Sequence, residues 1–460
     1  MRRLLPVLFA LTLPTTALAA GYDTPMLYSA RHMGMAGAAI SYVNDPSAAF
    51  HNPAGFARIK GGALMLDVSP LRGTIKASPN SHPEGKSIES VPAIAPLFLA
   101  GGGYRVWRDV VAGLSIFPVG SAAGGYEYPY EFDNTKTTKD SATLAFIEVS
   151  PTLAIALPMG FKFGATWRYT LATFQRKREQ QILGIDLDMK GSNMGGVRLG
   201  LQWSNDQFDI GVVYRNKLDI RVHADKAIML LPTPAEDVNF QFIFPSKVGF
   251  GAQFRGIKHL RLAADFEYAF NSENTETAVT GVVKGASPPE QKLKNMYYWE
   301  DGKTIRVGAA YAIGSAEIRG GYAHDTQVTQ KKYPSAFGTP PASTNIFSAG
   351  FGYKISDALD VSLAGAYRTG ATTVAKEDLD SKCLFCGNEG DYAINLFGAY
   401  LDVVWRFGEP AVAAAPPPTP VPAVEPTPGA AVEPAAVPAA VPVPAAVPAG
   451  ETAPAAPQVI

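Results

Sequence analysis

The chain has 460 residues, of which 47% are hydrophobic and 18% are charged, and its formal net charge is -1. A near-neutral chain lacks the basic field that nucleic-acid binding requires, so nucleic acid is not an expected partner. Charged residues are scarcer than the quarter or so usual in soluble domains. The apolar residues are nevertheless too dispersed after residue 20 to form a membrane-spanning helix, which needs about 20 in succession.

The N-terminal segment has the three parts of a secretory signal peptide. Arg2 and Arg3 precede an apolar run from Leu4 to Leu13, and Ala17-Leu18-Ala19 supplies an A-x-A cleavage site. The apolar run is too short to span a bilayer as a helix. We therefore expect residues 1–20 to be removed, so that the mature chain begins at Ala20 or Gly21 outside the cytoplasm.

Residues 21–61 form a segment dense in small side chains. Small residues let a backbone approach its surroundings closely, so this segment could plug a lumen or simply lead into the region that follows. Near its end, Asn52-Pro53 predicts a turn, because Asn tolerates unusual φ values and Pro fixes φ at the next position.

Residues 62–407 contain long stretches in which apolar and polar residues alternate. In the last stretch, one face carries Phe397, Leu401, Val403, Trp405 and Phe407, and the other carries Tyr400, Asp402 and Arg406. Side chains alternate across a strand with period two, so these are strands with one apolar and one polar face. Apolar-outward and polar-inward strands are typical of a transmembrane β-barrel.

Three further segments, 161–169, 208–222 and 260–270, show the same alternation. In the second, the alternation predicts one apolar face and one charged face running through to residue 222. The apolar face would carry Phe208, Ile210, Val212, Tyr214, Leu218 and Ile220, and the charged face Asp209, Arg215, Lys217, Asp219 and Arg221.

Short and long connections alternate along the strand region. Six short turns are expected at 107–109, 157–160, 204–207, 256–259, 313–316 and 356–358. Seven long loops are expected at about 72–92, 119–141, 178–193, 223–238, 272–296, 327–343 and 372–391. This layout predicts an all-β fold, a 14-stranded antiparallel transmembrane β-barrel with both chain ends on the periplasmic side. Strands longer than ten residues disfavour a soluble sandwich, whose strands average about five or six.

The two cysteines, Cys383 and Cys386, lie in a long loop. In an exported protein this spacing favours a small loop disulfide over a zinc site, which would need two more ligands nearby. No nucleophile elbow, H-E-x-x-H or phosphate-binding motif occurs. No catalytic residue, metal or cofactor is therefore expected, and the protein is not predicted to be an enzyme.

Beyond the strands, residues 408–460 are dominated by Pro, Ala and Val. Proline fixes φ and removes a hydrogen-bond donor, so this tail is expected to be a disordered, extended spacer in the periplasm. Two interpretations stay open: a linker without a partner, and a tether reaching periplasmic or cell-wall material.

Six arginines are predicted to point into the lumen, where they could hold a ligand carboxylate. They are Arg168, Arg198, Arg215, Arg261, Arg306 and Arg368. Alternatively they pair across the lumen with Asp209, Asp219, Asp265, Glu267, Asp360 and Asp402. An arginine without a partner beside an apolar pocket would be the informative exception, but the sequence does not identify one. The apolar loop residues 229–232 could form a capture site or pack on a neighbouring loop.

The mature chain up to Phe407 resembles the FadL/TodX family of outer-membrane transporters for hydrophobic compounds. The resemblance rests on Gly34-Met35-Ala36-Gly37, Asn44-Asp45, Asn52-Pro53-Ala54-Gly55, and later stretches such as Gly211–Arg215, Phe244–Val248 and Arg306–Tyr311. It implies that residues 21–61 are a hatch plugging the barrel, with Asn52, Pro53, Ala54 and Gly55 in a gating turn. It also implies an inner ligand pocket, for which Ala20, Gly21, Arg215 and Arg306 are the candidates.

The function expected from the resemblance is passive diffusion of long-chain fatty acids or other hydrophobic molecules through a plugged barrel among outer-membrane lipids. One alternative is a structural or surface-exposed barrel that acts through its loops and tail without transport. Another is a general porin, which a plug in the lumen disfavours.

Overall fold

The structure is a computed structural model that describes most of the chain between Asp23 and Gly408. The described residues are 23, 26–82, 86–130, 133–179, 184–229, 233–338, 340–383 and 386–408. Three predictions concern residues outside these ranges and stay predictions. They are the signal peptide, the pocket residues Ala20 and Gly21, and the tail from residue 409.

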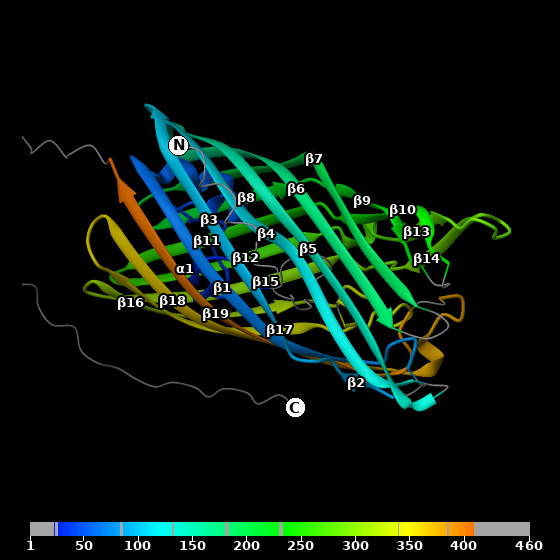
Figure 1. The fold of residues 1–460 in the computed structure, drawn as a ribbon. Coiled ribbons are helices and arrows are strands. Elements are labelled where there is room, and N and C mark those ends of the chain that lie inside the picture. Colours follow the sequence, from blue (N-terminus) through cyan, green and yellow to red (C-terminus); the bar gives the residue numbers. More distant parts are fainter. Residues whose placement is uncertain are drawn as a thin grey trace, which may run out of the picture. The chain divides into compact units, whose positions relative to one another are not determined.

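Fourteen strands close into one antiparallel barrel, which confirms the predicted fold class (Figure 1). Around the barrel they are β1 (Gly62–Ala77), β3 (Ala93–Trp107), β4 (Val110–Tyr130), β5 (Asp133–Ala156), β6 (Phe161–Glu179), β7 (Ile185–Ser204), β8 (Phe208–Arg215), β11 (Lys247–Ile257), β12 (Leu260–Ala269), β15 (Gly302–Ile313), β16 (Ala316–Asp325), β17 (Thr344–Lys354), β18 (Leu359–Val374) and β19 (Gly390–Phe407). The last strand closes on the first, with Gly62 opposite Phe407 and Lys76 opposite Ala393.

The long-loop end of the barrel carries more regular structure than the sequence predicts. The remaining strands are β2 (Ile88–Glu89), β9 (Leu218–Ala227), β10 (Ala235–Phe244), β13 (Glu276–Val282) and β14 (Glu290–Met296). Short 3₁₀ helices occur there at η3 (Asn271–Glu273) and η4 (Lys376–Asp378), whereas η2 (Pro158–Gly160) lies in the short turn between β5 and β6 at the opposite end. The segments predicted as loops at 223–238 and 272–296 therefore contain strands, because the sheet continues beyond the height at which lipid would cover it.

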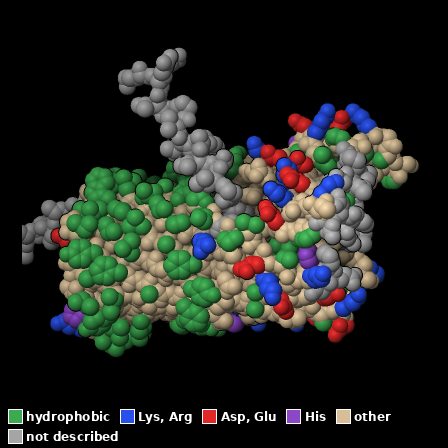
Figure 2. All heavy atoms as spheres, turned by 60° about the horizontal axis from the view of Figure 1, so that its bottom comes forward, with side chains coloured by type: hydrophobic (Ala, Val, Ile, Leu, Met, Phe, Trp, Pro, Cys, Tyr) green, Lys and Arg blue, Asp and Glu red, His purple; other side chains and the backbone are tan. Residues whose placement is uncertain are grey.

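An apolar belt surrounds the other part of the barrel. Phe397, Leu401 and Trp405 of β19 are about half exposed, whereas the alternating Tyr400 and Asp402 are buried. Figure 2 shows hydrophobic side chains covering one half of the visible face, with charged side chains gathered toward the opposite end. This is the distribution expected when lipid contacts the belt and water contacts the loops.

The alternation of β8 does not continue into β9, and the prediction for residues 218–222 is wrong. Phe208 and Tyr214 face outward, but Leu218 and Ile220 are buried while Asp219 is exposed. The ladder is interrupted at residues 216–217, opposite residues 245–246, between the pairs Arg215–Lys247 and Leu218–Phe244. Above this break the outer surface meets water and the inner surface lines a cavity, so the apolar face turns inward.

The N-terminal segment lies inside the barrel. Its elements are α1 (Ala30–Met33), α2 (Ala48–His51) and η1 (Pro53–Arg58), and nearly every residue between 26 and 59 is buried (Figure 1). Wall glycines give it room, since a Cβ added at Gly200 would collide with Asn52, and one at Gly211 with Ile40. Of the two interpretations left open by the sequence, the structure therefore supports a plug.

The hydrogen-bonded ladder between β3 and β4 is interrupted over part of the barrel height. The two strands pair only from Ala100–Ile116 to Trp107–Val110, while β3 continues along β1 and β4 continues along β5. The divergence begins near a β-bulge in β4, where Val119 has no partner between the pairs Pro118–Ile147 and Gly120–Phe146. Bulges bend the strand that contains them.

Candidate functional site

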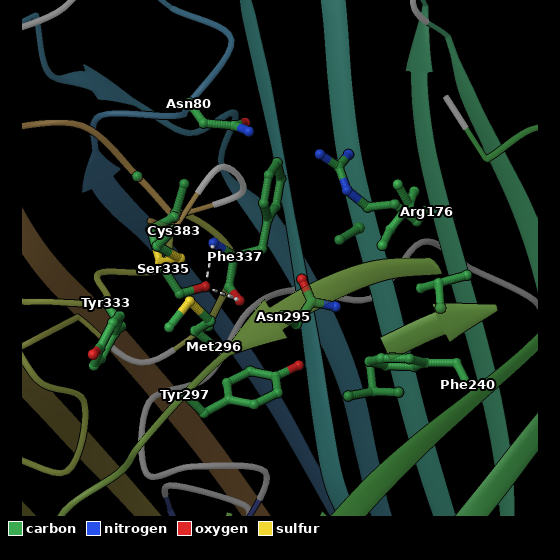
Figure 3. Close-up of a pocket in the computed structure, with 18 of the residues that line it drawn as sticks. Asn80, Arg176, Phe240, Asn295, Met296, Tyr297, Tyr333, Ser335, Phe337 and Cys383 are labelled. Atoms are coloured by element: carbon green, nitrogen blue, oxygen red, sulfur yellow. Dashed lines mark hydrogen bonds between the residues drawn. A yellow bond between two sulfur atoms is a disulfide. The ribbon is translucent and has the colours of Figure 1, made fainter. Parts of the chain in front are cut away.

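A mostly apolar cavity of about 220 Å³ lies at the long-loop end of the barrel (Figure 3). We call it the outer cavity. Its apolar lining comprises Leu144, Phe174, Leu187, Met229, Phe240, Phe242, Val279, Leu293, Met296, Trp299 and Phe337. Polar side chains around it include Asn80, Arg176, Arg178, Asn295, Tyr297 and Tyr333.

The inversion of the strand faces above residues 216–217 and 245–246 explains why this cavity is apolar. In β10, Val238, Phe240, Phe242 and Phe244 fall on the inner face because they occur at every second position. Sequence reasoning missed the cavity because it treated 223–238 as a loop. The alternation at 238–244 was the available signal. Met229, from the predicted apolar loop patch, lines the cavity, whereas residues 230–232 lie outside the described ranges.

The cysteine loop borders the outer cavity. Cys383 and Cys386 form a disulfide with a Cα–Cα distance of 5.5 Å, and both line the cavity. The Tyr333 hydroxyl donates to Asp380 at 3.0 Å, and the Asn388 side chain donates to the His82 carbonyl at 2.7 Å. The disulfide loop is thus tied to two other loops above the cavity.

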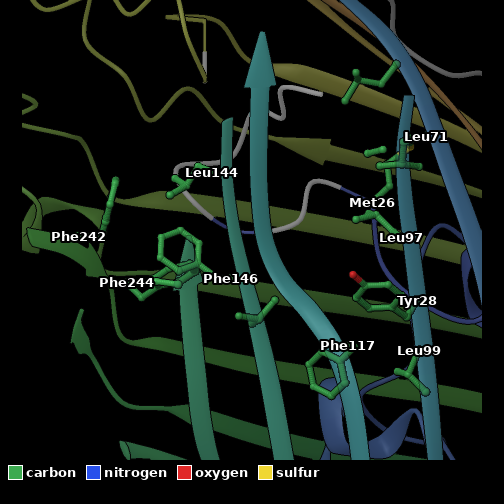
Figure 4. Packing of buried hydrophobic residues seen from close by; sticks show 14 of the residues in the cluster. Met26, Tyr28, Leu71, Leu97, Leu99, Phe117, Leu144, Phe146, Phe242 and Phe244 are labelled. Carbon is green, nitrogen blue, oxygen red and sulfur yellow. The ribbon is translucent and has the colours of Figure 1, made fainter. Parts of the chain in front are cut away.

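A column of phenylalanine rings leads from the outer cavity toward the hatch. Phe174 and Phe242 line the cavity with their ring centroids 5.2 Å apart, and Phe242 continues to Phe146 at 5.4 Å. Phe146 contacts Phe244 at 4.5 Å (Figure 4). The next residue, Pro245, accepts a hydrogen bond from Arg215 at 3.1 Å. The apolar column therefore ends beside a charged group.

A second, smaller cavity of about 50 Å³ lies against the hatch, and we call it the inner cavity. Its charged lining residues are Asp23, Arg198, Arg215, Lys247, Glu267 and Arg306. The structure thus brings together Arg215 and Arg306, two of the four residues expected at an inner pocket. Within the described residues the lining carries four cations and two carboxylates, a balance that favours an anionic guest.

Ion pairs hold the inner cavity in place. Arg215 donates to both oxygens of Asp23, at 2.7 and 3.0 Å, in a two-pronged arrangement that fits guanidinium to carboxylate. Lys247 joins Asp23 at 3.1 Å to Glu267 at 3.7 Å, and Glu267 also pairs with Arg306. Asp23 belongs to the hatch, so these contacts attach the hatch N-terminal side to the barrel wall.

Each of the six predicted lumen arginines has a carboxylate partner. The pairs are Arg168–Glu148, Arg198–Glu148, Arg215–Asp23, Arg261–Glu317, Arg306–Glu267 and Arg368–Asp325. Of the partners predicted from the sequence, this set contains only Glu267. The predicted partner Asp265 instead accepts hydrogen bonds from the Ala39 and Ile40 amides of the hatch, at 2.7 and 3.0 Å.

The turn predicted to gate the hatch fastens it to the wall. The Asn52 side-chain nitrogen lies 2.8 Å from the Ile40 carbonyl oxygen and 3.2 Å from those of Leu201 and Val212, in β7 and β8. Its side-chain oxygen accepts a hydrogen bond from the Ala54 amide at 3.1 Å. Pro53 begins η1, and a Cβ at Gly55 would collide with Val43.

Among the residues that the structure describes, no group of three or more His, Cys, Asp or Glu side chains is arranged to hold a metal ion. No helix among the same residues is both long and apolar enough to cross a membrane.

The fold and its two cavities define a plugged, fourteen-stranded membrane β-barrel. A family model described as "Outer membrane protein transport protein (OMPP1/FadL/TodX)" matches residues 10–396. The chain therefore belongs to this family, which consists of transport proteins rather than enzymes.

Solved structures of this family have the same fold. A FadL homologue of Pseudomonas aeruginosa has 16% identity and a TM-score of 0.67, covering 85% of this chain and 100% of its own. The Pseudomonas putida toluene transporter TodX has 16% identity and a TM-score of 0.62, with coverages of 85% and 100%. The Ralstonia pickettii toluene transporter TbuX has 17% identity and a TM-score of 0.60, with coverages of 83% and 99%. No curated protein sequence matches the chain.

Proposed function

We propose that the protein carries long-chain fatty acids or similar hydrophobic molecules across the outer membrane by passive diffusion. The observation that supports this most directly is the column of aromatic rings joining the apolar outer cavity to the charged inner cavity. Burial of apolar area, about 25 cal/mol per Å², would drive capture from water. The relatives named as toluene transporters support a hydrophobic substrate in general.

The interrupted ladder between β3 and β4 is the place in the wall at which we propose sideways release into the lipid. Val119, the bulged residue, lines the inner cavity, and Leu97 and Phe117 lie beside the hatch residues Met26 and Tyr28 (Figure 4). An unpaired strand edge within a bilayer is costly, because lipid offers no hydrogen-bond partner. The Tyr28 hydroxyl reduces this cost by donating to the Pro118 carbonyl at 2.5 Å.

In this proposal Asn52, Pro53, Ala54 and Gly55 anchor the hatch while the ligand leaves through the wall. Displacing the whole hatch would break the hydrogen bonds of Asn52 and the ion pair of Arg58 with Asp209, whose atoms lie 2.9 Å apart. Sideways release breaks none of these, so it is the route with the lower cost.

The proposed test uses full-length protein in liposomes and a fluorescent long-chain fatty acid. We expect saturable binding and flux into the vesicles, and a changed flux after deletion of residues 21–55. A sugar of similar cross-section serves as the control, because a water-filled porin would pass it and a plugged barrel would not. Absence of saturable binding to any hydrophobic ligand would contradict the proposal and favour the structural alternative.

We also propose that residues 409–460 extend into the periplasm from the short-turn end. Phe407 ends β19 opposite Gly62, at the same end as the short turns, which supports this placement. Co-sedimentation of the protein with purified peptidoglycan, with and without the tail, distinguishes a tether from a linker. If the tail is a tether, the protein without it should no longer co-sediment with peptidoglycan. If the tail is only a linker, its removal should change nothing.

A further inference from the structure

One buried arginine of the outer cavity forms no ion pair with any residue that the structure describes. Arg178, in β6, lines the cavity and is only 6% exposed. Its Nε makes no hydrogen bond, and its guanidinium forms no ion pair within 4.0 Å among the described residues. It is therefore the exceptional arginine that the sequence could not identify.

The carboxylate that lies opposite Arg178 in the β5–β6 ladder is already engaged. Asp140 lies opposite Arg178 in the β5–β6 register, and it pairs with Arg176. Asp140 also accepts hydrogen bonds from Ser81 at 3.2 Å and Tyr128 at 3.3 Å. Two guanidinium groups thus lie near one carboxylate at this side of the cavity, and only Arg176 forms an ion pair with it.

Arg176 is held by further contacts, which leaves Arg178 as the group available to a ligand. The Arg176 guanidinium lies over the Phe337 ring, 4.3 Å from its centroid (Figure 3). A buried cation without a partner is unfavourable, so an anion entering the cavity would relieve that cost. The neighbouring surface offers apolar contacts from Phe174 and Leu187, which would suit a hydrocarbon chain.

We propose that Arg178 determines the specificity of the outer cavity by binding the carboxylate of an amphipathic molecule whose hydrocarbon part contacts the phenylalanine rings. This rests on the proposed function, because it assumes that the cavity takes a hydrophobic ligand. A guanidinium recognises a carboxylate by charge-assisted hydrogen bonds, which an alcohol or a hydrocarbon cannot match. The cavity therefore selects acids over neutral molecules of equal length.

The test compares dodecanoate with dodecanol, which has the same chain length and no charge. Full-length protein in phosphatidylcholine nanodiscs is titrated with each probe, and empty nanodiscs supply the background. We expect dodecanoate to bind at least about tenfold more tightly, as one charge-assisted hydrogen bond would produce. R178Q should remove this preference by weakening dodecanoate binding to the level of dodecanol, and R178K should keep part of the preference.

R221Q is the matched control, because Arg221 is exposed on the outer side of β9, away from the cavity lining. It should retain the preference of the natural protein. Equal binding of the two probes by the natural protein, or a preference that survives in R178Q, overturns the inference alone. If R178Q loses affinity for both dodecanoate and dodecanol, the inference is also overturned, because Arg178 would then support the packing of the cavity rather than recognise a carboxylate. If neither probe binds the natural protein, the result contradicts the proposed function as well as this inference.

Discussion

Single residues decide how closely the hatch fits its wall. Gly200 in β7 faces the side chain of Asn52, and a Cβ there would occupy the position of the Asn52 oxygen. Gly320 in β16 has no atom within 4 Å of such a Cβ. The two glycines therefore separate the effect of crowding the hatch from the general effect of adding a methyl group to a strand.

We expect G200A to destabilise the docked hatch by about 1–3 kcal/mol, as overpacking of a close-packed interior does. G320A should leave the hatch unchanged. Hydrogen exchange of residues 48–58 measures the difference. Equal protection in the two variants would show that the wall yields to the added methyl group.

His51 gives the hatch a dependence on pH. Burial, assisted by the nearby His32, lowers the pKa of His51 from 6.5 to about 3, and its Nε2 lies 3.0 Å from the Tyr28 carbonyl oxygen. Because the folded pKa is depressed, the unfolded segment takes up a proton first as the solution is acidified. The contribution of neutral His51 is complete above pH 6.5 and is lost as the pH falls from 6.5 toward 3.

Hatch protection should therefore decline over that window, by about 1.4 kcal/mol for each pH unit below 6.5. Hydrogen exchange of residues 26–33 and 48–58 at pH 7.5 and at pH 5 checks the expectation. Glutamine at position 51 can donate to the Tyr28 carbonyl and does not titrate, so H51Q should show a shallower decline. An unchanged slope in H51Q would assign the pH dependence to other groups.

At the scale of elements, one extra residue in β4 separates it from β3. Pro118 and Gly120 pair with adjacent residues of β5, so Val119 is surplus to the ladder and bends the strand. The same residue lines the inner cavity. The bulge therefore links the interrupted ladder to the cavity from which, in our proposal, a ligand would leave.

Deletion of Val119 should restore a regular register and bring β4 back toward β3. We expect fatty-acid flux through liposomes to fall by at least tenfold, while binding at the outer cavity is retained. Val119→Ala keeps the bulge and should keep most of the flux. Unchanged flux after the deletion would show that the ligand leaves past the hatch instead.

At the scale of the whole molecule, one barrel presents opposite surfaces at its two ends. Around the hatch the wall is apolar outside and charged inside, and above residues 216–217 it is polar outside and apolar inside. The first arrangement suits lipid outside and a polar plug, and the second suits water outside and a hydrophobic guest. A hydrophobic ligand thus meets the apolar interior first and the charged interior last.

Local alternation and turn chemistry were enough to predict the barrel, its strand number and the grouping of the short turns at the end where the first strand begins and the last strand ends. Each strand shows its two faces within its own residues, such as Trp405 against Asp402, and each short turn has its own composition. Ion-pair partners that lie far apart in the chain could not be predicted from such local patterns. Arg215 pairs with Asp23 and Arg168 with Glu148 because the closed barrel and the hatch bring them together.

The tertiary structure alone decided where the strand faces invert, where the ladder of the wall is interrupted, and which buried arginine forms no ion pair among the described residues. These features depend on register and on the environment at each height of the barrel, which one sequence does not encode locally. Arg178 illustrates the difference. Its residue type is plain in the sequence, but only the tertiary structure shows that Arg176, Ser81 and Tyr128 occupy the carboxylate of Asp140, which lies opposite it.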